Sequence, residues 1–313
     1  MITQHNPLDK KIYVVIVTFN GERWIRECIS SLLKLREKPE IIVIDNASQD
    51  NTISIINSEF KTVTLFSQAK NLGFGRANNI GIDYAIKDGA DFVLLINQDA
   101  RVHKDMLSSL LIIAQENRDY GLLSPIHWNY EGTCIDPKFQ RYLLDSDPLI
   151  FSDFFIGKKK SIYSVRFVPA AIWLLKTEMI LQVGTFDPVY FLYGEDDDLA
   201  KRIRLKCWKI GIVPGSIGYH YHSVVHNEGK FNEAQSFAEA VDILKFSGKP
   251  FLQAFFFVFR KFLADMISSL LMMDFYAFGL YIKNQFKVMR NIRKIWKSKK
   301  QIRLNTNESN TAK

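Results

Sequence analysis

Short runs rich in Val, Ile and Leu alternate with helix-like stretches along the N-terminal part of the chain. Continuous apolar runs of strand length are typical of strands covered on both faces, as in parallel sheets. The stretches 22–35 and 75–87 between them carry apolar residues at helical spacing and are long enough for crossovers. The pattern predicts an α/β fold with a Rossmann-like, mostly parallel central sheet and flanking helices. The predicted strands are 12–19 (IYVVIVTF), 40–46 (EIIVIDN), 62–68 (TVTLFSQ) and 91–97 (DFVLLIN).

Polar residues follow each of these runs. In open α/β sheets, ligands bind beyond the carboxyl ends of the strands, so these residues are the first candidates for a site. Asp45 is placed to accept hydrogen bonds from a nucleobase or ribose, although it could instead form an Asx turn or cap the next helix. The candidates are Thr18, Asn20, Asp45, Asn46, Asn71, Asn97, Gln98 and Asp99.

Two further segments at this edge carry specific chemistry. In NLGFGRANN (71–79), Gly73 and Gly75 precede a helix and allow close approach of the backbone to a ligand, but taken alone the segment is explained better by an ordinary βα turn. Asp99 lies beside Asn97 and Gln98, and such oxygen donors suit Mg²⁺ or Mn²⁺.

Four consecutive acids, Glu195 to Asp198, precede a predicted helix at 199–208. Acids in a first turn complement the helix dipole, which accounts for one or two of them. Four in a row repel one another and raise at least one pKa, which favours a general base or a metal ligand.

Three histidines, His220, His222 and His226, lie within GYHYHSVVHN. In an extended strand the first two point the same way. The cluster indicates a metal or phosphate site, and a zinc site built from all three is the lesser alternative.

The net charge of +8 is concentrated near the C-terminus. Residues 283–303 contain nine Lys and Arg and no acid. The rest of the chain has 32 basic and 33 acidic residues and is therefore nearly neutral. A nucleic-acid-binding domain usually spreads its basic footprint over a folded face, so this distribution argues against nucleic acid. We interpret the basic stripe as an attachment device.

In order and spacing, six motifs together resemble family 2 glycosyltransferases of the GT-A fold. They are most similar to the bacterial rhamnosyltransferase-like branch that builds O-antigen and other surface polysaccharides. The resemblance covers about residues 11–225. The motifs are TFNGERWIRECISSL, IIVIDNASQDNT, NLGFGRANNIGI, LLINQDA, VGTFDPVYFLYGEDDDLAKRIR and the histidine segment.

This resemblance implies inverting transfer of a sugar, foremost rhamnose from TDP-rhamnose, from a nucleoside diphosphate donor to a glycan or polyprenyl-linked glycan. It implies a catalytic domain over 1–230, with a nucleotide-binding half at about 11–120 and an acceptor half at about 120–230. Asp196 matches the catalytic base, and Asp99 and His220 match ligands of a Mg²⁺ or Mn²⁺ ion. Residues implied to bind the donor are Thr18, Asn20, Glu22, Asp45, Asn71, Gly73, Arg76, Asn79 and Gln98.

One position departs from the family pattern. The first acidic position of the DxD-type metal motif is Asn97, which leaves the metal fewer anionic ligands. The alternatives are a catalytically inactive subunit that binds nucleotide-sugars and, less favoured, a nucleotidyltransferase, although TFNGERW lacks the basic Gly-rich loop of that class.

The C-terminal region, 231–303, is expected to be helical and amphipathic, with a disordered tail at 304–313. Apolar Val288, Met289, Ile292, Ile295 and Trp296 form one face of a basic helix at 283–300, which suits the surface of an anionic membrane. The Phe-rich stretch 251–282 could enter lipid, pack on the catalytic domain or mediate homo-oligomers.

The sequence also indicates where the protein acts. The longest uncharged run in this region, 250–259, is too short to span a bilayer. No secretory signal precedes the first predicted strand, and three cysteines without metal-type spacing favour a reducing compartment. We therefore expect a cytoplasmic protein, peripherally associated with the inner face of the bacterial cytoplasmic membrane.

Overall fold

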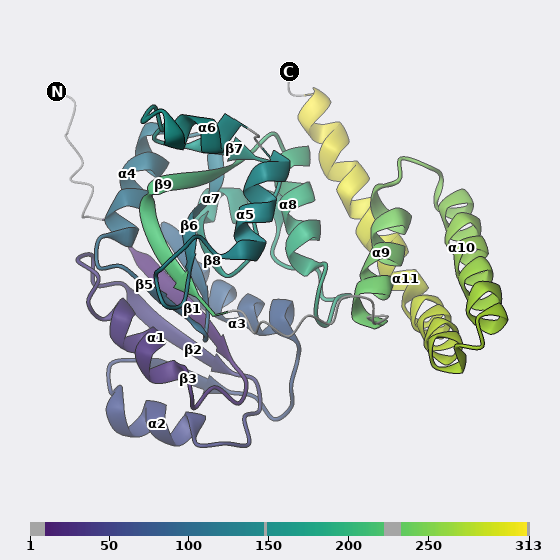
Figure 1. Ribbon diagram of the computed structural model, residues 1–313, viewed down its shortest axis with the longest axis horizontal. Coiled ribbons are helices and arrows are strands. Elements are labelled where there is room, and N and C mark those ends of the chain that lie inside the picture. Colours follow the sequence, from purple (N-terminus) through teal and green to yellow (C-terminus); the bar gives the residue numbers. More distant parts are fainter. Residues whose placement is uncertain (1–9, 147–148, 222–232, 312–313) are drawn as a thin grey trace. The chain divides into compact units, whose positions relative to one another are not determined.

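The computed structural model describes residues 10–146, 149–221 and 233–311, with side chains described up to residue 302 (Figure 1). The chain divides into two units. The sheet unit comprises Met1–Phe186 and Leu199–Val224, and the helical unit comprises Asp187–Asp198 and Val225–Lys313. The acidic segment at 195–198 therefore groups with the C-terminal helices, whereas the sequence indicated one catalytic domain over 1–230.

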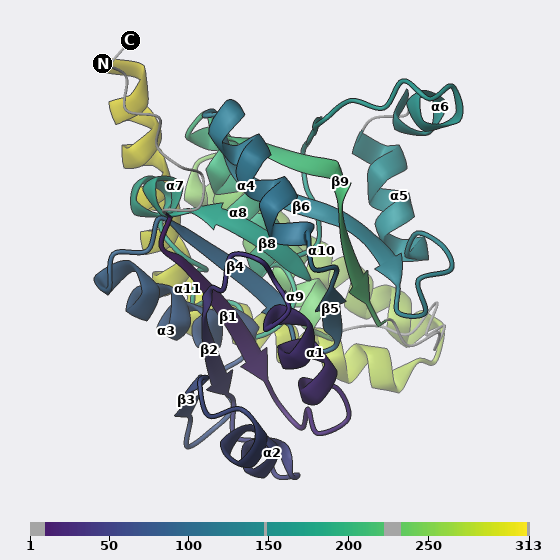
Figure 2. The ribbon, with the colours of Figure 1, turned by 90° about the vertical axis from the view of Figure 1, so that its left-hand side faces the viewer.

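One mixed sheet forms the centre of the sheet unit, in the order β3-β2-β1-β4-β8-β6-β9-β5, with β7 beside β9 (Figure 2). The strands β3, β2, β1 and β4 are parallel, as the apolar runs predicted. These strands are β1 (Ile12–Thr18), β2 (Glu40–Asp45), β3 (Thr64–Ser67) and β4 (Phe92–Asn97).

Antiparallel pairing enters the sheet at β8. This strand runs antiparallel to both β4 and β6, while β6 and β9 are parallel to each other. Strands β5 and β7 both pair antiparallel to β9. The bounds are β5 (Ala100–Val102), β6 (Tyr120–Asn129), β7 (Tyr163–Val165), β8 (Ile172–Lys176) and β9 (Lys209–His220).

Helices cover both faces of this sheet. Successive residues of β1 belong to different hydrophobic clusters, Val14 and Ile16 to one and Tyr13 and Val15 to the other. The double burial explains why the strands are continuously apolar. The helices are α1 (Ile25–Leu32), α2 (Thr52–Glu59), α3 (Phe74–Lys87), α4 (Met106–Glu116), α5 (Pro137–Ser146), α6 (Leu149–Phe155), α7 (Thr177–Val183) and α8 (Glu195–Leu205).

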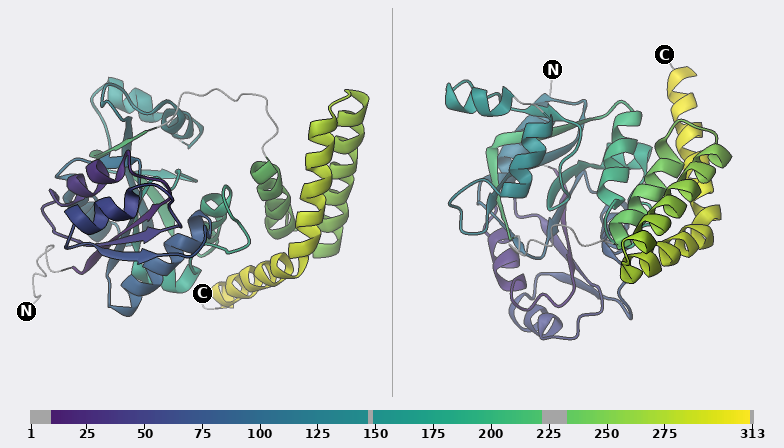
Figure 3. Two further views of the ribbon diagram at one scale, coloured as in Figure 1. Left: turned by 90° about the horizontal axis from the view of Figure 1, so that it is seen from below. Right: turned by 45° about the vertical axis from the view of Figure 1, so that its right-hand side comes forward.

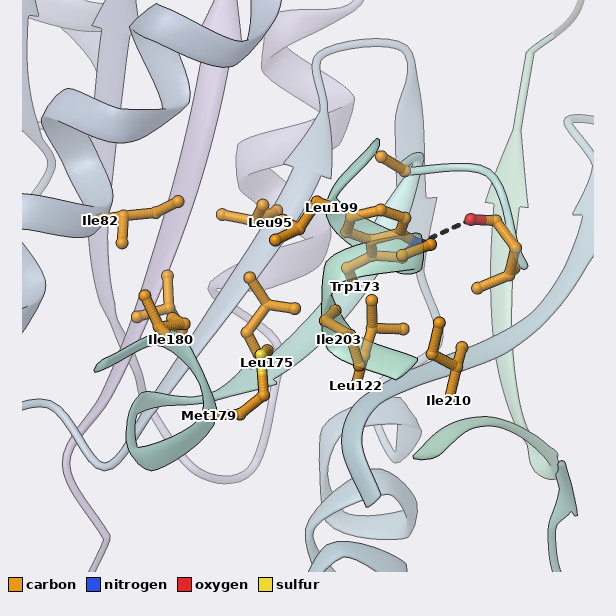
Figure 4. Close-up of a cluster of buried hydrophobic side chains, with 14 of the residues drawn as sticks. Ile82, Leu95, Leu122, Trp173, Leu175, Met179, Ile180, Leu199, Ile203 and Ile210 are labelled. Atoms are coloured by element: carbon orange, nitrogen blue, oxygen red, sulfur yellow. Dashed lines mark hydrogen bonds between the residues drawn. The ribbon is translucent and has the colours of Figure 1, made fainter. Parts of the chain in front are cut away.

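Trp173 of β8 lies at the centre of one of these clusters (Figure 4). Its side chain is fully buried, and its indole Nε1–H donates to the carbonyl of Val168 over 3.2 Å. Leu199 and Ile203 of α8 belong to the same cluster. A buried tryptophan thus contributes its full apolar area without leaving its N–H group unsatisfied.

Three helices form most of the helical unit: α9 (Glu233–Phe246), α10 (Phe251–Leu271) and α11 (Phe275–Thr311) (Figure 3). Their core includes Phe237 and Val241 of α9 and Val258 and Phe262 of α10. Within the described residues, no helix is both long and apolar enough to cross a bilayer.

The structure corrects the expected use of the apolar face on α11. Val288 and Ile295 are buried in the core of the helical unit, and Ile292 packs against it. Only Met289 and Trp296 of that face stay exposed. An isolated amphipathic pattern predicts that a face will be covered, but not what covers it.

The helix α11 also extends further than expected. It continues to Thr311, through a segment that the sequence indicated as a disordered tail from residue 304. The segment 301–311 contains neither Gly nor Pro, so no residue in it interrupts a helix already started.

Candidate functional site

The carboxyl ends of β1, β2 and β4 meet at one edge of the sheet. Thr18 pairs in register with Asp45, and Val17 pairs with Asn97. Thr18 and Asp45 are fully buried at the ends of their strands. These polar side chains therefore lie at one edge of the sheet.

Gln98 fastens the loop that follows β1. Its Oε1 accepts hydrogen bonds from Thr18 Oγ1 at 2.6 Å and from the backbone N–H of Phe19 at 3.0 Å, and its Nε2 donates to the carbonyl of Phe19. A Cβ at Gly21 would lie 2.3 Å from Gln98 Oε1 and 2.4 Å from Thr18 Oγ1. Only glycine fits there, so Gly21 and Gln98 together fix the path of the chain beside Thr18.

Asp45 carries an unused hydrogen-bonding atom. Its Oδ2 accepts from the backbone N–H of Ser48 at 3.1 Å, which is the turn interaction considered from the sequence. Its buried Oδ1 has no hydrogen-bond partner within the part of the chain that the structure describes. A buried carboxylate oxygen without a donor is costly, so this atom is suited to accept a hydrogen bond from a ligand.

The loop 71–73 is held by a network of amides. Asn46 Nδ2 donates to Asn71 Oδ1 at 2.9 Å, and Asn46 Oδ1 accepts from the backbone N–H of Leu72 at 2.7 Å. Gly73 has φ = +84° at the start of α3, a backbone conformation that residues other than glycine rarely adopt. Asn46 was a candidate only by position, and the structure gives it the role of holding this loop.

Two predicted donor-binding residues lie on α3. Arg76 is exposed in the first turn. Asn79 is bound to the backbone of Phe186, donating to its carbonyl at 2.8 Å and accepting from its N–H at 3.0 Å. The Nδ2 and Oδ1 atoms of Asn79 can each make one further hydrogen bond. A donor-binding role for Asn79 stays a prediction.

Asn20 and Glu22 fasten the segment 48–51 to the loop after β1. Asn20 has φ = +50°, its N–H donates to Ser48 Oγ, and its Oδ1 accepts from the N–H of Gln49 at 2.8 Å. Glu22 Oε2 accepts from the N–H of Asn51 at 2.9 Å. Both side chains thus shape the rim of the edge, and their contact with a nucleoside stays a prediction.

Asn97, Asp99 and His220 converge on one another. His220 Nε2 lies 3.3 Å from Asp99 Oδ1 and 3.3 Å from Asn97 Nδ2. The pairing of β5 with β9, in which Ala100 lies opposite His220, brings these distant parts of the sequence together. His220 is buried, whereas the side chain of Asp99 is 30% exposed, so this group of residues is accessible from its Asp99 side.

These residues offer an incomplete set of metal ligands. The buried Oδ1 of Asn97 has no described partner, and Asp99 supplies a carboxylate. Among the described residues, no group of three or more His, Cys, Asp or Glu could hold a metal ion. The set fits a cation that takes further oxygens from a bound phosphate, as Mg²⁺ commonly does. His222 and His226 lie outside the described residues.

The acidic segment of the helical unit begins α8. Glu195 is buried, and its burial, together with repulsion from Asp196 and Asp198, raises its pKa to about 7. Asp196 Oδ1 accepts from the backbone N–H of Asp197 at 2.8 Å. One member of the cluster thus has a raised pKa, as the sequence indicated, and the role of Asp196 as a base stays a prediction.

A buried ion cluster holds this segment. Lys245 Nζ donates to Asp187 Oδ2 at 2.7 Å and to Asp198 Oδ1, and Ser298 Oγ donates to Asp187 Oδ2 at 2.6 Å. Burial raises the pKa of Asp187, but Lys245 and Ser298 outweigh it, and the pKa is lowered. Sequence reasoning missed Lys245, because nothing in the sequence of α9 marks one lysine as buried.

An aromatic cluster flanks His220 and was also missed. The ring centroids of Trp24 and Tyr221 lie 4.4 Å apart, and the Arg23 guanidinium lies 4.2 Å from the Trp24 ring. Arg101 belongs to the same cluster, because it lies 3.9 Å from the Tyr219 ring and 5.3 Å from the Tyr130 ring, which in turn lies 5.4 Å from Trp24. Aromatic residues separated in sequence carried no shared spacing that could have identified the cluster.

The chain matches a known family model and several named proteins. Residues 13–183 match the model of glycosyl transferase family 2. The rhamnosyltransferase WbbL of Escherichia coli K12 is 26% identical over 223 residues, which cover 67% of this chain and 83% of WbbL. The N-acetylglucosaminyl-diphospho-decaprenol L-rhamnosyltransferase of Mycobacterium tuberculosis H37Rv is 25% identical over 239 residues, which cover 69% of this chain and 77% of that protein.

A solved structure supports the fold. The mannosyltransferase PcManGT of Pyrobaculum calidifontis, determined with GDP-Man and Mn²⁺, aligns with a TM-score of 0.54 at 17% identity. The alignment covers 96% of this chain and 87% of PcManGT. The fold expected from the sequence motifs is therefore confirmed as GT-A-like.

Replacing Lys245 with methionine should destabilise the helical unit. The substitution leaves Asp187 and Asp198 without their shared cation, and breaking a buried pair in this way costs about 3–5 kcal/mol. Urea denaturation followed by circular dichroism measures the change. The control is Lys261→Met, which breaks an exposed pair with Glu239 and should cost at most about 1 kcal/mol. Equal losses in both variants would contradict a structural role for the buried cluster.

Proposed function

Because this chain belongs to glycosyl transferase family 2, we propose that it transfers a sugar from a nucleoside diphosphate donor with inversion at the anomeric carbon. Rhamnose from TDP-rhamnose is the proposed donor, since the two relatives described above are named as rhamnosyltransferases. A glycan or lipid-linked glycan is the proposed acceptor. The name of the mycobacterial relative contains a decaprenol-linked sugar, which supports this choice.

The unpartnered Oδ1 of Asp45 is the observation that carries this proposal. It is a buried acceptor at the sheet edge where open α/β folds bind nucleotides. The adjacent Thr18 and the loop 71–73 are fastened by hydrogen bonds before any ligand arrives. A nucleoside that donates to Asp45 would complete the hydrogen bonding of this edge.

Inverting transfer is a single displacement, so it needs one base and one stabilised leaving group. We assign Asp196 as the base that accepts the proton of the acceptor hydroxyl, on its match to the family motif. Asp99 and His220, with Asn97, would hold a divalent cation. Such a cation would neutralise the negative charge that develops on the leaving diphosphate.

We further propose that the protein works at the inner face of the cytoplasmic membrane. A lipid-linked acceptor is presented at a membrane surface, and the excess positive charge of the chain is concentrated in 283–303. Cytoplasmic nucleotide-sugars would then reach the sheet edge from solution.

A panel of donors tests the reaction. Incubation with TDP-rhamnose, UDP-sugars and GDP-mannose should release nucleoside diphosphate, fastest with TDP-rhamnose. Release is measured by a coupled assay for the diphosphate. Tight binding of a donor without any release, in the presence of extracts containing lipid-linked glycans, would instead identify a binding subunit. Release of pyrophosphate from a nucleoside triphosphate would identify a nucleotidyltransferase.

Asp196→Asn should lower turnover by at least about 100-fold while leaving the donor dissociation constant unchanged, since a positioned base contributes about 10² to 10⁴ in rate. The matched control is Asp197→Asn, which removes the same charge one residue away. Steady-state rates and donor titrations separate the two effects. Comparable losses in both variants would show that the charge of the segment, rather than Asp196 itself, matters.

Asp99→Ala should weaken donor binding only when a divalent cation is present. EDTA should abolish transfer, and Mn²⁺ or Mg²⁺ should restore it, because the diphosphate shares the cation with Asp99. Calorimetric titration of the nucleoside diphosphate, with Mn²⁺ and with EDTA, measures the effect. Full activity of the wild-type enzyme in exhaustive chelator would overturn metal dependence.

A further inference from the structure

The helix α10 has a second apolar face that nothing in the described structure covers. Its buried side faces the core of the helical unit through Ala254, Val258 and Phe262. The opposite side repeats large apolar residues at intervals of three and four, which places them on one face. Their exposed fractions range from 41% to 65%. We call this the outer face of α10: Leu252, Phe256, Phe259, Leu263, Ile267 and Leu270.

The turn between α10 and α11 continues this apolar surface. The residues that we call the apolar turn are between 68% and 80% exposed. Asp274, the one charged residue among them, is engaged locally, because its Oδ1 accepts from the backbone N–H of Ala277 at 2.9 Å and so caps α11. The apolar turn consists of Leu271, Met272, Met273, Phe275 and Tyr276.

Positive charge accompanies these apolar residues. Residues 251–300 contain ten Lys and Arg but only two acids, Asp265 and Asp274. On the exposed side of α11, Phe286 and Trp296 are 72% and 48% exposed. At about 100° per residue, Arg290, Arg293 and Lys297 project within about 40° of Phe286, whereas Trp296 lies at the edge of that side, about 80° from Phe286. Exposed aromatic and basic residues on one side of a helix are typical of binding to the interface of an anionic bilayer.

We propose that the outer face of α10 and the apolar turn insert into the interfacial layer of an anionic lipid bilayer. This deepens the membrane location put forward under the proposed function, and it assigns the contact to a different surface from the face of Val288 and Ile295. Neither α10 nor α11 is both long and apolar enough to cross a bilayer, so the proposed contact lies in the surface of the bilayer.

Charge and shape favour lipid over a second copy of the chain. A second copy would bring the same excess of positive charge to the contact, and like charges oppose association. A helix pair buries one stripe on each partner, whereas the apolar turn exposes several successive residues in different directions. An anionic bilayer accommodates both features, because it surrounds the turn and attracts the cations.

Flotation of the full-length protein tests the insertion. Vesicles of phosphatidylcholine alone are compared with vesicles that also contain phosphatidylglycerol, and the partition coefficient is measured for each. Leu271→Ser/Phe275→Ser should lower partition into the anionic vesicles at least about tenfold, since apolar burial scales with the area inserted. The matched control, Phe155→Ser/Leu181→Ser, removes two exposed apolar side chains of the sheet unit and should leave partition unchanged.

A second variant tests the charge. Arg290→Gln/Arg293→Gln/Lys297→Gln should remove most of the preference for anionic vesicles and weaken the salt dependence of binding. All substituted side chains are exposed, so circular dichroism and the thermal midpoint should match the wild type. Equal partition of the wild type and the apolar-turn variant, or equal wild-type binding to both vesicle types, would overturn the proposal.

The remaining outcomes are also decisive. A concentration-dependent dimer in sedimentation that Leu263→Ser/Ile267→Ser abolishes would assign the outer face of α10 to a second copy and overturn lipid insertion. Release of nucleoside diphosphate from a soluble donor is measured in parallel. Flotation without release of nucleoside diphosphate would support the membrane surface and contradict the proposed reaction. Release without flotation would support the reaction and overturn the membrane surface.

Discussion

The in-register parallel pairing of β2, β1 and β4 is the constraint on which the site depends. Each strand buries both faces, so polar side chains are tolerated only where the strands end. Pairing Thr18 with Asp45 and Val17 with Asn97 makes those ends coincide. A slip of one residue would turn every side chain to the opposite face and separate the polar ends. The hydrophobic core therefore sets the geometry of the site before any ligand is bound.

The sequence revealed the part of this arrangement that is local or periodic. Apolar runs located β1, β2, β3 and β4 to within about two residues, because burial on both faces leaves a pattern that is readable without the partner strands. The convergence of Asp99 with His220 has a different origin. It requires β5 to pair antiparallel with the end of β9, across more than a hundred residues, and no spacing in the sequence encodes that pairing. There the family motifs supplied the residues, and the structure supplies the reason that they meet.

In the helical region, the sequence predicted which face is apolar but not which residues cover it. Helical periodicity correctly identified an apolar side of α11, but the partner was wrong, because Val288 and Ile295 pack against α9 and α10 rather than remaining free. The same limit applies to Lys245, which looks like any surface lysine of an amphipathic helix and is instead fully buried between two aspartates. A sequence shows which side chains prefer burial, whereas the neighbour that buries them is a property of the whole fold.

The helical unit contains both the acidic segment and the exposed apolar surface, which lie far apart in the sequence. Lys245 of α9 binds Asp198, two residues from Asp196, and Ser298 of α11 binds Asp187 at the other end of the same segment. Helices α10 and α11 of this unit also carry the exposed apolar surface. Since a buried ion cluster tolerates little displacement of its partners, the acidic segment is tied to the packing of α9 and α11. If the helical unit lies on lipid, the segment that bears Asp196 is thus bound to a part of the chain that contacts the membrane.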